Sequence, residues 1–422
     1  MLGIDTMSRA RAYNSLPKTV KYLQSYDWLD FRAYSKVGFR TFENILPLLT
    51  GLPPITTRVL EEQFKALEKN AHRFMWNRFK EAGYMTAFGE THMETFFRFY
   101  ELHPTDHYVR RFEEELWRGN YVCSGSMFPE RHLFDYILQF IRAYKDPYFG
   151  FFFSNSFSHD YPGSPALLDK HLIEFLEQLR QTKSWNSTFV VLFSDHGVTY
   201  GKPRNDKQKE FYYEERLPML FMQVPDDFKE VFPDEYFNMQ WNQNRLTTVY
   251  DLHATMLKIL SLSTNTRQSK PDACPKVTGL TEKISSKRTC KDACVSEIYC
   301  TCQCLINAPN TWLTRKSLNV AVSKVQQISQ AIKTDVKCTK CAKLKYEKTN
   351  RIHFYTRGNK TWYIVNFDVS PGYKSFEAIL EYDGQRFTHL VTEITKAMAD
   401  QSCVYAYQDK VYCECIKDNK CT

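Results

Sequence analysis

The stretch Phe189-Val-Val-Leu-Phe-Ser-Asp-His-Gly197 decides the fold, because a short apolar run ends directly in polar residues and a glycine. Such a continuous apolar run is typical of a parallel strand that is covered on both faces. Two further runs of this kind are Tyr148 to Phe153 and Met219 to Met222. The segment from Leu167 to Leu179, which follows the first of these, has apolar residues at helical spacing. This order predicts an α/β fold, a doubly wound and mostly parallel sheet with helices on both faces.

Polar side chains that follow the predicted strands form a candidate site, because ligands of such sheets bind beyond the carboxyl ends of the strands. Asp195 and His196 follow one apolar run. His159 follows another, and Asp5 follows a strand stub at the N-terminus. An Asp after a strand is commonly a helix N-cap, so Asp5 alone also has a structural explanation. Together, Asp5, Asp195 and His196 predict a divalent cation that lowers the pKa of a neighbouring hydroxyl and neutralises an anionic ester.

A candidate nucleophile precedes a predicted helix. Thr41 to Asn44 come directly before a helical run from Ile45 to Gly51. A Thr in this place is more often a helix cap than a nucleophile. At a helix N-terminus, however, Thr41 would meet the cation, and the backbone N–H groups of the first turn would face phosphoryl oxygens. Asn44, one turn further on, would donate to the same oxygens.

The cysteines predict a module that is held together by disulfides. Of 13 cysteines, Cys123 stands alone and the other twelve lie between Cys274 and Cys421. An even number in a lysine-rich segment with few apolar runs is typical of disulfide frameworks. Zinc is the alternative, since Cys300-Thr-Cys-Gln-Cys304 and Cys338-Thr-Lys-Cys341 resemble metal-binding spacings. No histidine accompanies them at finger spacing, which favours disulfides.

Charge and composition change along the chain. Residues 267–351 contain 17 basic and 6 acidic residues, a surplus of +11, so the rest of the chain has a net charge of −3 and the whole chain one of +8. A solvated basic face is the preferred interpretation of this surplus, and attraction of acidic glycans, nucleic acid or anionic lipid is the alternative. No specific nucleic-acid binding is predicted. A polar stretch from Ser261 to Pro275 marks a boundary between a catalytic domain, residues 1–265, and a cysteine-rich C-terminal region, residues 266–422. Strand-like alternation within that region predicts a small β-rich lobe.

Several features predict a location outside the cytosol, secreted or anchored to a membrane. The cysteine framework agrees with this location, as do the glycosylation sequons at Asn186 and Asn359. No run approaches the roughly 18 apolar residues that span a bilayer. The segment Met1-Leu-Gly-Ile-Asp5 resembles the end of a strand whose beginning is missing, so a signal or an anchor is expected upstream.

Four motifs together resemble the alkaline-phosphatase-like and sulfatase superfamily: Leu2 to Arg9, Thr41 to Gly51, Ser158 to Asp160 and Ser194 to Gly197. Further motifs, such as Arg288-Thr-Cys-Lys-Asp-Ala-Cys294, are similar to the uncharacterised animal family called domain of unknown function 229. The resemblance extends over nearly the whole chain. It implies a fold of the alkaline-phosphatase-like type and metal-dependent hydrolysis or transfer of phosphate esters, less readily sulfate esters. The substrate would be an ester, for example of a glycan or a lipid head group.

The resemblance also implies roles for single residues. Asp5, Asp195 and His196 would be ligands of one or two zinc, manganese or magnesium ions. Thr41 would be the nucleophile and a further ligand.

Three other residues would act on the substrate. Asn44 matches a residue that contacts the phosphate, and His159 lies where relatives place a substrate-binding or second-metal histidine. Arg204 would steady an anionic substrate, with a surface arginine as the alternative. His253 is interpreted as packing within a helix.

The chain departs from the family pattern beside the expected pocket. Relatives usually have Pro where this chain has Glu43. They also tend to have Glu-Asp where this chain has Glu90-Thr91, and a glycine-rich stretch where it has Lys207 to Phe211. The C-x-P-x-R frame of sulfatases is absent, which argues against formylglycine chemistry. These departures leave a second class of protein open, a catalytically inactive extracellular binding protein that retains the fold.

Overall fold

The computed structural model describes residues 1–54, 65, 68–91, 105–109, 129–145, 147–160, 165–199, 209–264, 271–396, 402–405 and 407–418. These residues form two compact units: the first ends at Cys302, and the second contains the described residues from Gln303 onward together with residues 209–211. The first unit extends beyond the boundary predicted after residue 265, because part of the cysteine-rich segment packs on it. The backbone N–H of Leu280, for example, donates to Oγ1 of Thr255 over 2.7 Å.

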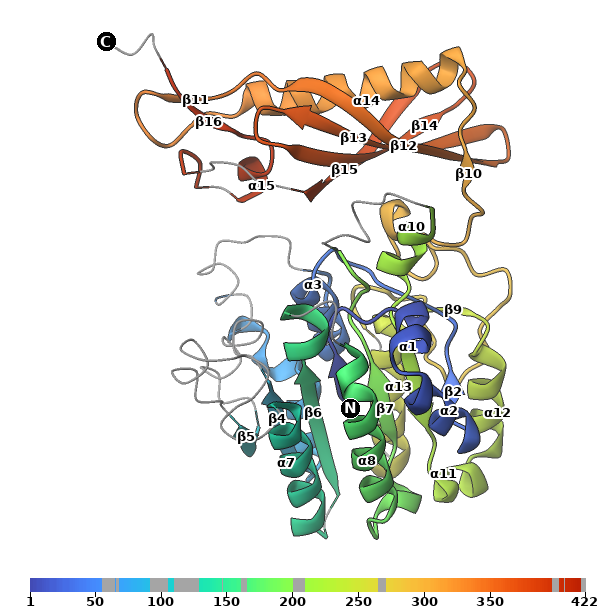
Figure 1. Cartoon of the computed structure of the whole chain (residues 1–422). Coiled ribbons are helices and arrows are strands. Elements are labelled where there is room, and N and C mark those ends of the chain that lie inside the picture. Colours follow the sequence, from blue (N-terminus) through green and yellow to red (C-terminus); the bar gives the residue numbers. More distant parts are fainter. Residues whose placement is uncertain are drawn as a thin grey trace. The chain divides into compact units, whose positions relative to one another are not determined.

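A mostly parallel sheet of seven strands runs through the described part of the first unit, as predicted (Figure 1). Strand β1 lies between β6 and β7 and is parallel to both. Strand β8 is antiparallel to β7, so the interpretation of Met219 to Met222 as a further parallel strand was wrong. An apolar run indicates that a strand is buried but does not fix its direction. In spatial order the strands are β2 (Leu29–Asp30), β8 (Leu220–Gln223), β7 (Val190–Phe193), β1 (Leu2–Ile4), β6 (Tyr148–Ser154), β4 (Met85–Glu90) and β5 (His107–Val109).

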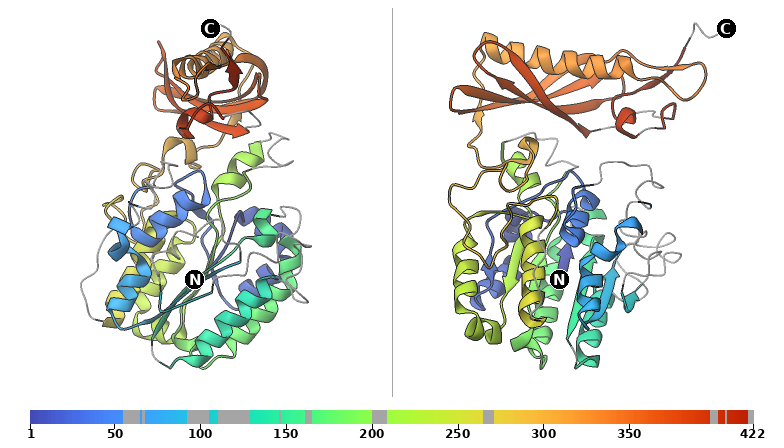
Figure 2. Two further views of the ribbon diagram at one scale, coloured as in Figure 1. Left: turned by 90° about the vertical axis from the view of Figure 1, so that its left-hand side faces the viewer. Right: turned by 180° about the vertical axis from the view of Figure 1, so that it is seen from behind.

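Helices cover both faces of this sheet (Figure 2). On one face, Phe152 and Leu192 share a core with Leu172 of α8. On the other face, Phe151 packs against Trp76 of α5. The helices up to Cys302 are α1 (Arg9–Ser15), α2 (Pro17–Ser25), α3 (Thr41–Thr50), α5 (Met75–Glu81), α7 (Pro129–Ala143), α8 (Leu168–Arg180), α10 (Lys209–Arg216), α11 (Asp226–Val231), α12 (Pro233–Asn242) and α13 (Val249–Thr264). Strands β3 (Ala33–Ser35) and β9 (Leu246–Thr248) form a separate parallel pair.

The second unit contains the predicted β-rich lobe. Helix α14 (Trp312–Ala331) lies along one face of an antiparallel sheet (Figure 1). Val325 of this helix shares a core with Val365, Phe367 and Phe376. The strands of the sheet, in spatial order, are β10 (Ile306–Asn307), β12 (Lys345–Arg357), β13 (Lys360–Ser370), β14 (Lys374–Tyr382) and β15 (Phe387–Lys396). Strands β11 (Thr339–Cys341) and β16 (Cys415–Lys417) form a small second sheet.

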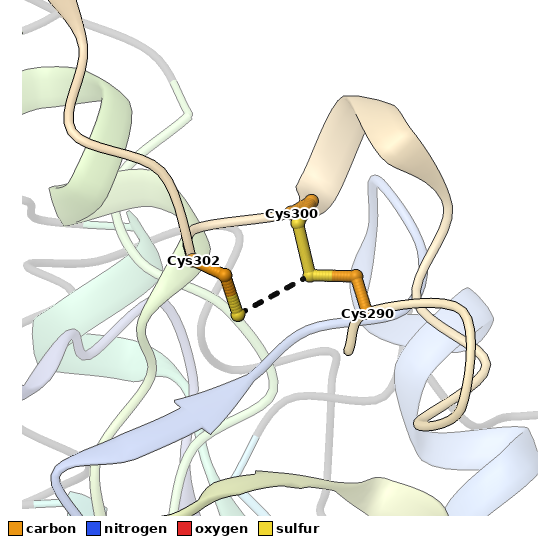
Figure 3. Close-up of side chains that lie close together, drawn as sticks. All are labelled: Cys290, Cys300 and Cys302. Carbon is orange, nitrogen blue, oxygen red and sulfur yellow. Dashed lines mark hydrogen bonds between the residues drawn. A yellow bond between two sulfur atoms is a disulfide. The ribbon is translucent and has the colours of Figure 1, made fainter. Parts of the chain in front are cut away.

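Disulfides join most of the described cysteines, as predicted. In the first unit, Cys274 is bonded to Cys294 and Cys290 to Cys300. The Sγ of Cys302 lies 3.5 Å from that of Cys290 (Figure 3). These sulfurs are close enough to share a metal ion, but two of them are joined to each other, so the structure favours disulfides over zinc. The second unit contains Cys341–Cys413 and Cys403–Cys415.

Candidate functional site

The carboxyl ends of β1 and β7 bring three predicted metal ligands together. Gly3 of β1 pairs with Phe193 of β7, so the two parallel strands end side by side. Asp5 follows the first strand, and Asp195 and His196 follow the second. Ligand atoms of these three residues all lie within 4.8 Å of one another, and the three side chains are buried. The structure therefore gathers this ligand trio at one edge of the sheet.

Thr41 is the first residue of α3 and joins the ligand trio. Its Oγ1 lies 3.2 Å from Nε2 of His196, and its side chain is buried. Helix α3 ends at Gly51, whose φ of +68° is the left-handed conformation that glycine adopts readily. The N–H groups of a helical first turn have no acceptor within the helix, and the helix dipole is positive at this end. Thr41 thus lies where the ligand trio and a helix N-terminus meet.

Asn44 holds the turn that leads into α3. Its Oδ1 accepts hydrogen bonds from the N–H groups of Val37 and Gly38, over 2.8 and 2.9 Å. Its Nδ2 donates to the carbonyl oxygens of Gly38 and Arg40, over 3.0 and 2.9 Å. These four bonds fill the hydrogen-bonding capacity of a carboxamide. In this structure Asn44 therefore positions Thr41, and its amide has no further N–H for the predicted contact with a phosphate oxygen.

Glu43, the departure from the family pattern, caps the same turn. Its Oε2 accepts a hydrogen bond from the N–H of Phe39 over 2.6 Å. Glu43 is the third residue of α3, a position from which glutamate side chains commonly reach back across the helix start. The exchange of proline for glutamate thus has a local structural explanation. It also places a negative charge in the first turn of the helix.

A hydrogen bond fixes which ring nitrogen of His196 is protonated. Nδ1 lies 2.7 Å from the carbonyl oxygen of Gly197. A carbonyl oxygen can only accept, so Nδ1 carries the proton. Burial lowers the pKa of His196, against the opposing effect of Asp195, and the neutral imidazole is favoured. Nε2 is therefore unprotonated, and its lone pair is available at the site that His196 shares with Asp5 and Asp195.

Two acceptors face each other in the ligand trio. Oδ2 of Asp195 lies 3.1 Å from Nε2 of His196, and among the described residues this buried oxygen has no hydrogen-bond partner. Two lone pairs at this distance repel unless a proton or a cation lies between them, and the lowered pKa of His196 disfavours the proton. Ligand atoms lie about 2.0–2.2 Å from a zinc ion, so two ligands of one ion approach each other in this way. Asp5, Asp195 and His196 therefore fit a divalent cation, and Thr41 lies beside them.

A buried ion pair supports the segment after His196. Nζ of Lys36 lies 2.8 Å from Oε1 of Glu215, and both side chains are buried. The backbone oxygen of Glu215 accepts from the N–H of Gly197 over 3.1 Å, and the charge of Lys36 also lowers the pKa of His196. A side chain on Gly197 has no room, because a Cβ would lie 1.8 Å from the carbonyl oxygen of Glu214. Nothing in the sequence singled out Lys36.

The other predicted residues differ in their placement. His159 follows β6 in a short π-helix with an exposed side chain, and its charge contributes to lowering the pKa of His196. Arg204 lies outside the described residues. His253 is buried on α13, where its Nδ1 lies 2.8 Å from the carbonyl oxygen of Leu48 and burial lowers its pKa to about 4. The interpretation of His253 as a packing residue is confirmed.

Fold and site together define an α/β protein with a candidate ion site at the carboxyl edge of a mostly parallel sheet. The chain belongs to the family described as protein of unknown function (DUF229), which matches residues 1–350. The resemblance that the motifs indicated is thereby confirmed. No curated protein matches the chain significantly.

Several solved structures are similar to the chain at low identity. A protein in the alkaline phosphatase superfamily from Vibrio parahaemolyticus has a TM-score of 0.44 and 16% identity, covering 97% of this chain and 83% of that one. The lipoteichoic acid synthase LtaP from Listeria monocytogenes has a TM-score of 0.45 and 13% identity, covering 92% and 85%. The phosphonate monoester hydrolase SpPMH from Silicibacter pomeroyi has a TM-score of 0.47 and 12% identity, covering 91% and 88%. Residue roles in this chain rest on its own geometry.

Proposed function

We propose that the chain is a metal-dependent hydrolase or transferase that acts on phosphate esters through Thr41. The observation that carries this proposal is the pair of acceptors, on Asp195 and His196, that face each other at 3.1 Å beside Thr41. A divalent cation would satisfy both acceptors, and zinc, manganese and magnesium take oxygen or nitrogen ligands of this kind. When bound, the cation lowers the pKa of the Thr41 hydroxyl and offsets the charge of the ester.

Thr41 supplies the nucleophile in this proposal. Its Oγ1 forms a bond to phosphorus while the bond from phosphorus to the leaving oxygen breaks, which produces a phosphothreonine and an alcohol. The N–H groups in the first turn of α3 stabilise the charge on the phosphoryl oxygens. Water then attacks the phosphothreonine in a hydrolase, or a second alcohol does so in a transferase, and Thr41 is restored. Asn44 acts indirectly, because its four bonds fix the turn before Thr41.

The substrate class follows from a motif that the chain lacks and from the family resemblance. Phosphate esters are favoured over sulfate esters, since the C-x-P-x-R frame that matures to formylglycine is absent. The substrate would be an ester of a glycan or a lipid head group, as the family resemblance implies. We assign substrate binding to His159 and Arg204, the first because its charge acts on His196 from an exposed position.

The site is tested by hydrolysis of a panel of aryl phosphodiesters, phosphomonoesters and sulfates with added zinc, manganese or magnesium. Wild type is expected to turn over a phosphate ester only with metal. Thr41→Ala should lose activity by about three orders of magnitude or more, as nucleophile removal does elsewhere. Thr41→Ser keeps a hydroxyl and should retain part of the activity. Equal turnover by wild type and Thr41→Ala would contradict the role of Thr41.

A catalytically inactive extracellular binding protein is the second candidate, and Glu43 favours it. The Glu43 carboxylate lies in the first turn of α3, where it opposes the binding of an anionic ester. Glu43→Gln separates the two candidates. If the chain is an enzyme, this variant should lower KM for an anionic ester. A folded protein that binds metal but turns over no ester, with or without Glu43→Gln, would favour the binding protein.

We propose that the protein acts outside the cytosol. Its disulfides are typical of secreted and extracellular proteins. Asn186 and Asn359, the two sequon asparagines, are both exposed. Among the described helices, none has the length and apolar character needed to cross a membrane.

A further inference from the structure

Thr6, the residue after Asp5, makes a buried set of hydrogen bonds between separate segments. Its Oγ1 donates to Oδ1 of Asp5 over 2.7 Å. Its N–H donates to Oδ1 of Asp195 over 3.1 Å. Its carbonyl oxygen accepts from Nη1 of Arg11 over 2.6 Å. Thr6 is fully buried, and two of its three polar groups contact carboxylates that are proposed metal ligands.

Arg11 extends this set of bonds to a third strand end. Its Nη1 also donates to the carbonyl oxygen of Ser158, over 3.1 Å, and its side chain is buried. Ser158 precedes His159 in the π-helix that follows β6. Thr6 and Arg11 therefore connect the carboxyl ends of β1, β7 and β6, which are neighbours in the sheet.

The backbone of Thr6 is strained. Its φ is +56°, in the left-handed region that β-branched residues rarely adopt. Residues in such conformations persist where surrounding bonds over-determine them, and they cluster at functional centres. Glycine would adopt this φ without strain. The chain thus has a threonine where backbone stability alone favours glycine, which indicates that the hydroxyl is needed.

We propose that Thr6 is a positioning residue that sets the two carboxylate ligands, Asp5 and Asp195, for cation binding. The bonds from Thr6 hold Oδ1 of each carboxylate. Oδ2 of Asp195 is thereby left to face Nε2 of His196. The strained backbone at residue 6 brings one N–H and one hydroxyl to two carboxylates at once. This inference rests on the proposed function, because it assigns a role within the same cation site.

The test compares Mn²⁺ affinity with the stability of the metal-free protein. Thr6→Gly relieves the backbone strain but also removes the hydrogen bond to Asp5, and because these effects oppose each other, the metal-free protein should keep nearly the stability of wild type. Its Mn²⁺ affinity should fall by about 10–100-fold, as is typical when a partner of a metal ligand is lost. Thr6→Ser keeps the hydroxyl and should bind Mn²⁺ as wild type does. Asp27→Gly is the matched control, since exposed Asp27 has φ +55° and its replacement relieves strain away from the ligand trio.

Calorimetric titration with Mn²⁺ and thermal unfolding in EDTA, both on the full chain, provide the two readouts. Unchanged Mn²⁺ affinity in Thr6→Gly would overturn the inference and leave the proposed function intact. A Thr6→Gly protein that loses stability together with affinity would show a purely structural role and would also overturn it. Wild type that binds neither Mn²⁺ nor Zn²⁺ would overturn the proposed function, and the role of Thr6 with it.

Discussion

Asp195 shows how far the sequence alone predicts the role of a single residue. Its place after an apolar run, beside His196, was enough to predict a ligand pair, because the carboxyl edge of a parallel sheet is where ligands bind. Thr6 and Lys36 could not be predicted in the same way. Their importance depends on bonds to Asp195 and Glu215, which are far away in the chain and meet only in the fold. A threonine or a lysine alone carries no signal of such a partner.

Asp195→Asn is expected to separate stability from metal binding. The amide of Asn can donate to Nε2 of His196, so two facing acceptors become a donor and an acceptor. In the metal-free protein the free energy of unfolding should rise by about 1–3 kcal/mol, because this is the usual cost of a buried polar group without a partner. Its affinity for Mn²⁺ should fall by more than the roughly 10–100-fold seen for residues outside the ligand shell. Urea unfolding in EDTA and calorimetric titration measure both effects, and unchanged Mn²⁺ affinity would exclude Asp195 as a ligand.

Helix α3 depends on side chains at both of its ends. Asn44 and Glu43 hold the turn at its start, and His253 of α13 contacts the carbonyl oxygen of Leu48 near its end. The sequence indicated the helix and its final glycine. It also predicted that Asn44 would contact substrate, because spacing places the residue near the helix start. Spacing does not show whether an amide turns toward a ligand or toward the preceding turn.

The contact between α13 and α3 should respond to pH through His253. Its pKa is about 4 in the folded protein, against about 6.5 for an unperturbed histidine. The unfolded chain therefore binds the proton more readily, and the contribution of the neutral ring is present above about pH 6.5 and lost as pH falls toward 4. Between pH 7 and pH 4.5 this effect should lower the free energy of unfolding by about 2 kcal/mol.

His253→Asn provides the comparison, since its amide can still donate to the carbonyl oxygen of Leu48 but does not titrate. Urea unfolding at several pH values should show a shallower decline in the variant than in wild type. Parallel pH profiles would contradict the assignment of this effect to His253.

At the scale of the whole molecule, apolar runs and their spacing were sufficient to predict the fold class. The runs that became β6 and β7 and the helix α8 lie where the pattern predicted them. The direction of β8 was not predictable, because burial looks the same for either direction. The compact units also differ from the boundary predicted after residue 265. The polar stretch marks the end of the strand–helix pattern, whereas the disulfide-bonded segment up to Cys302 still packs on the first unit.

Glycosylation should show whether both units pass through the secretory pathway. Asn186 lies in the 3-10 turn Trp185–Ser187, and Asn359 lies between β12 and β13; both are exposed. Protein secreted from a eukaryotic host should therefore carry one glycan at each site. Intact mass before and after enzymatic deglycosylation measures this, with Asn186→Gln and Asn359→Gln each expected to remove one glycan. Secreted protein without either glycan would count against the proposed passage through the secretory pathway.

The most direct test of the central claim is to trap the covalent intermediate on Thr41. Wild type is mixed with an aryl phosphate ester that it turns over in the presence of metal, quenched in acid, and digested for mass spectrometry. The proposed mechanism predicts a phosphorylated peptide with the modification on Thr41, which is absent when metal is removed with EDTA and absent in Thr41→Ala. Turnover with no modification of Thr41 under any quench, or a modification on another residue, would contradict it.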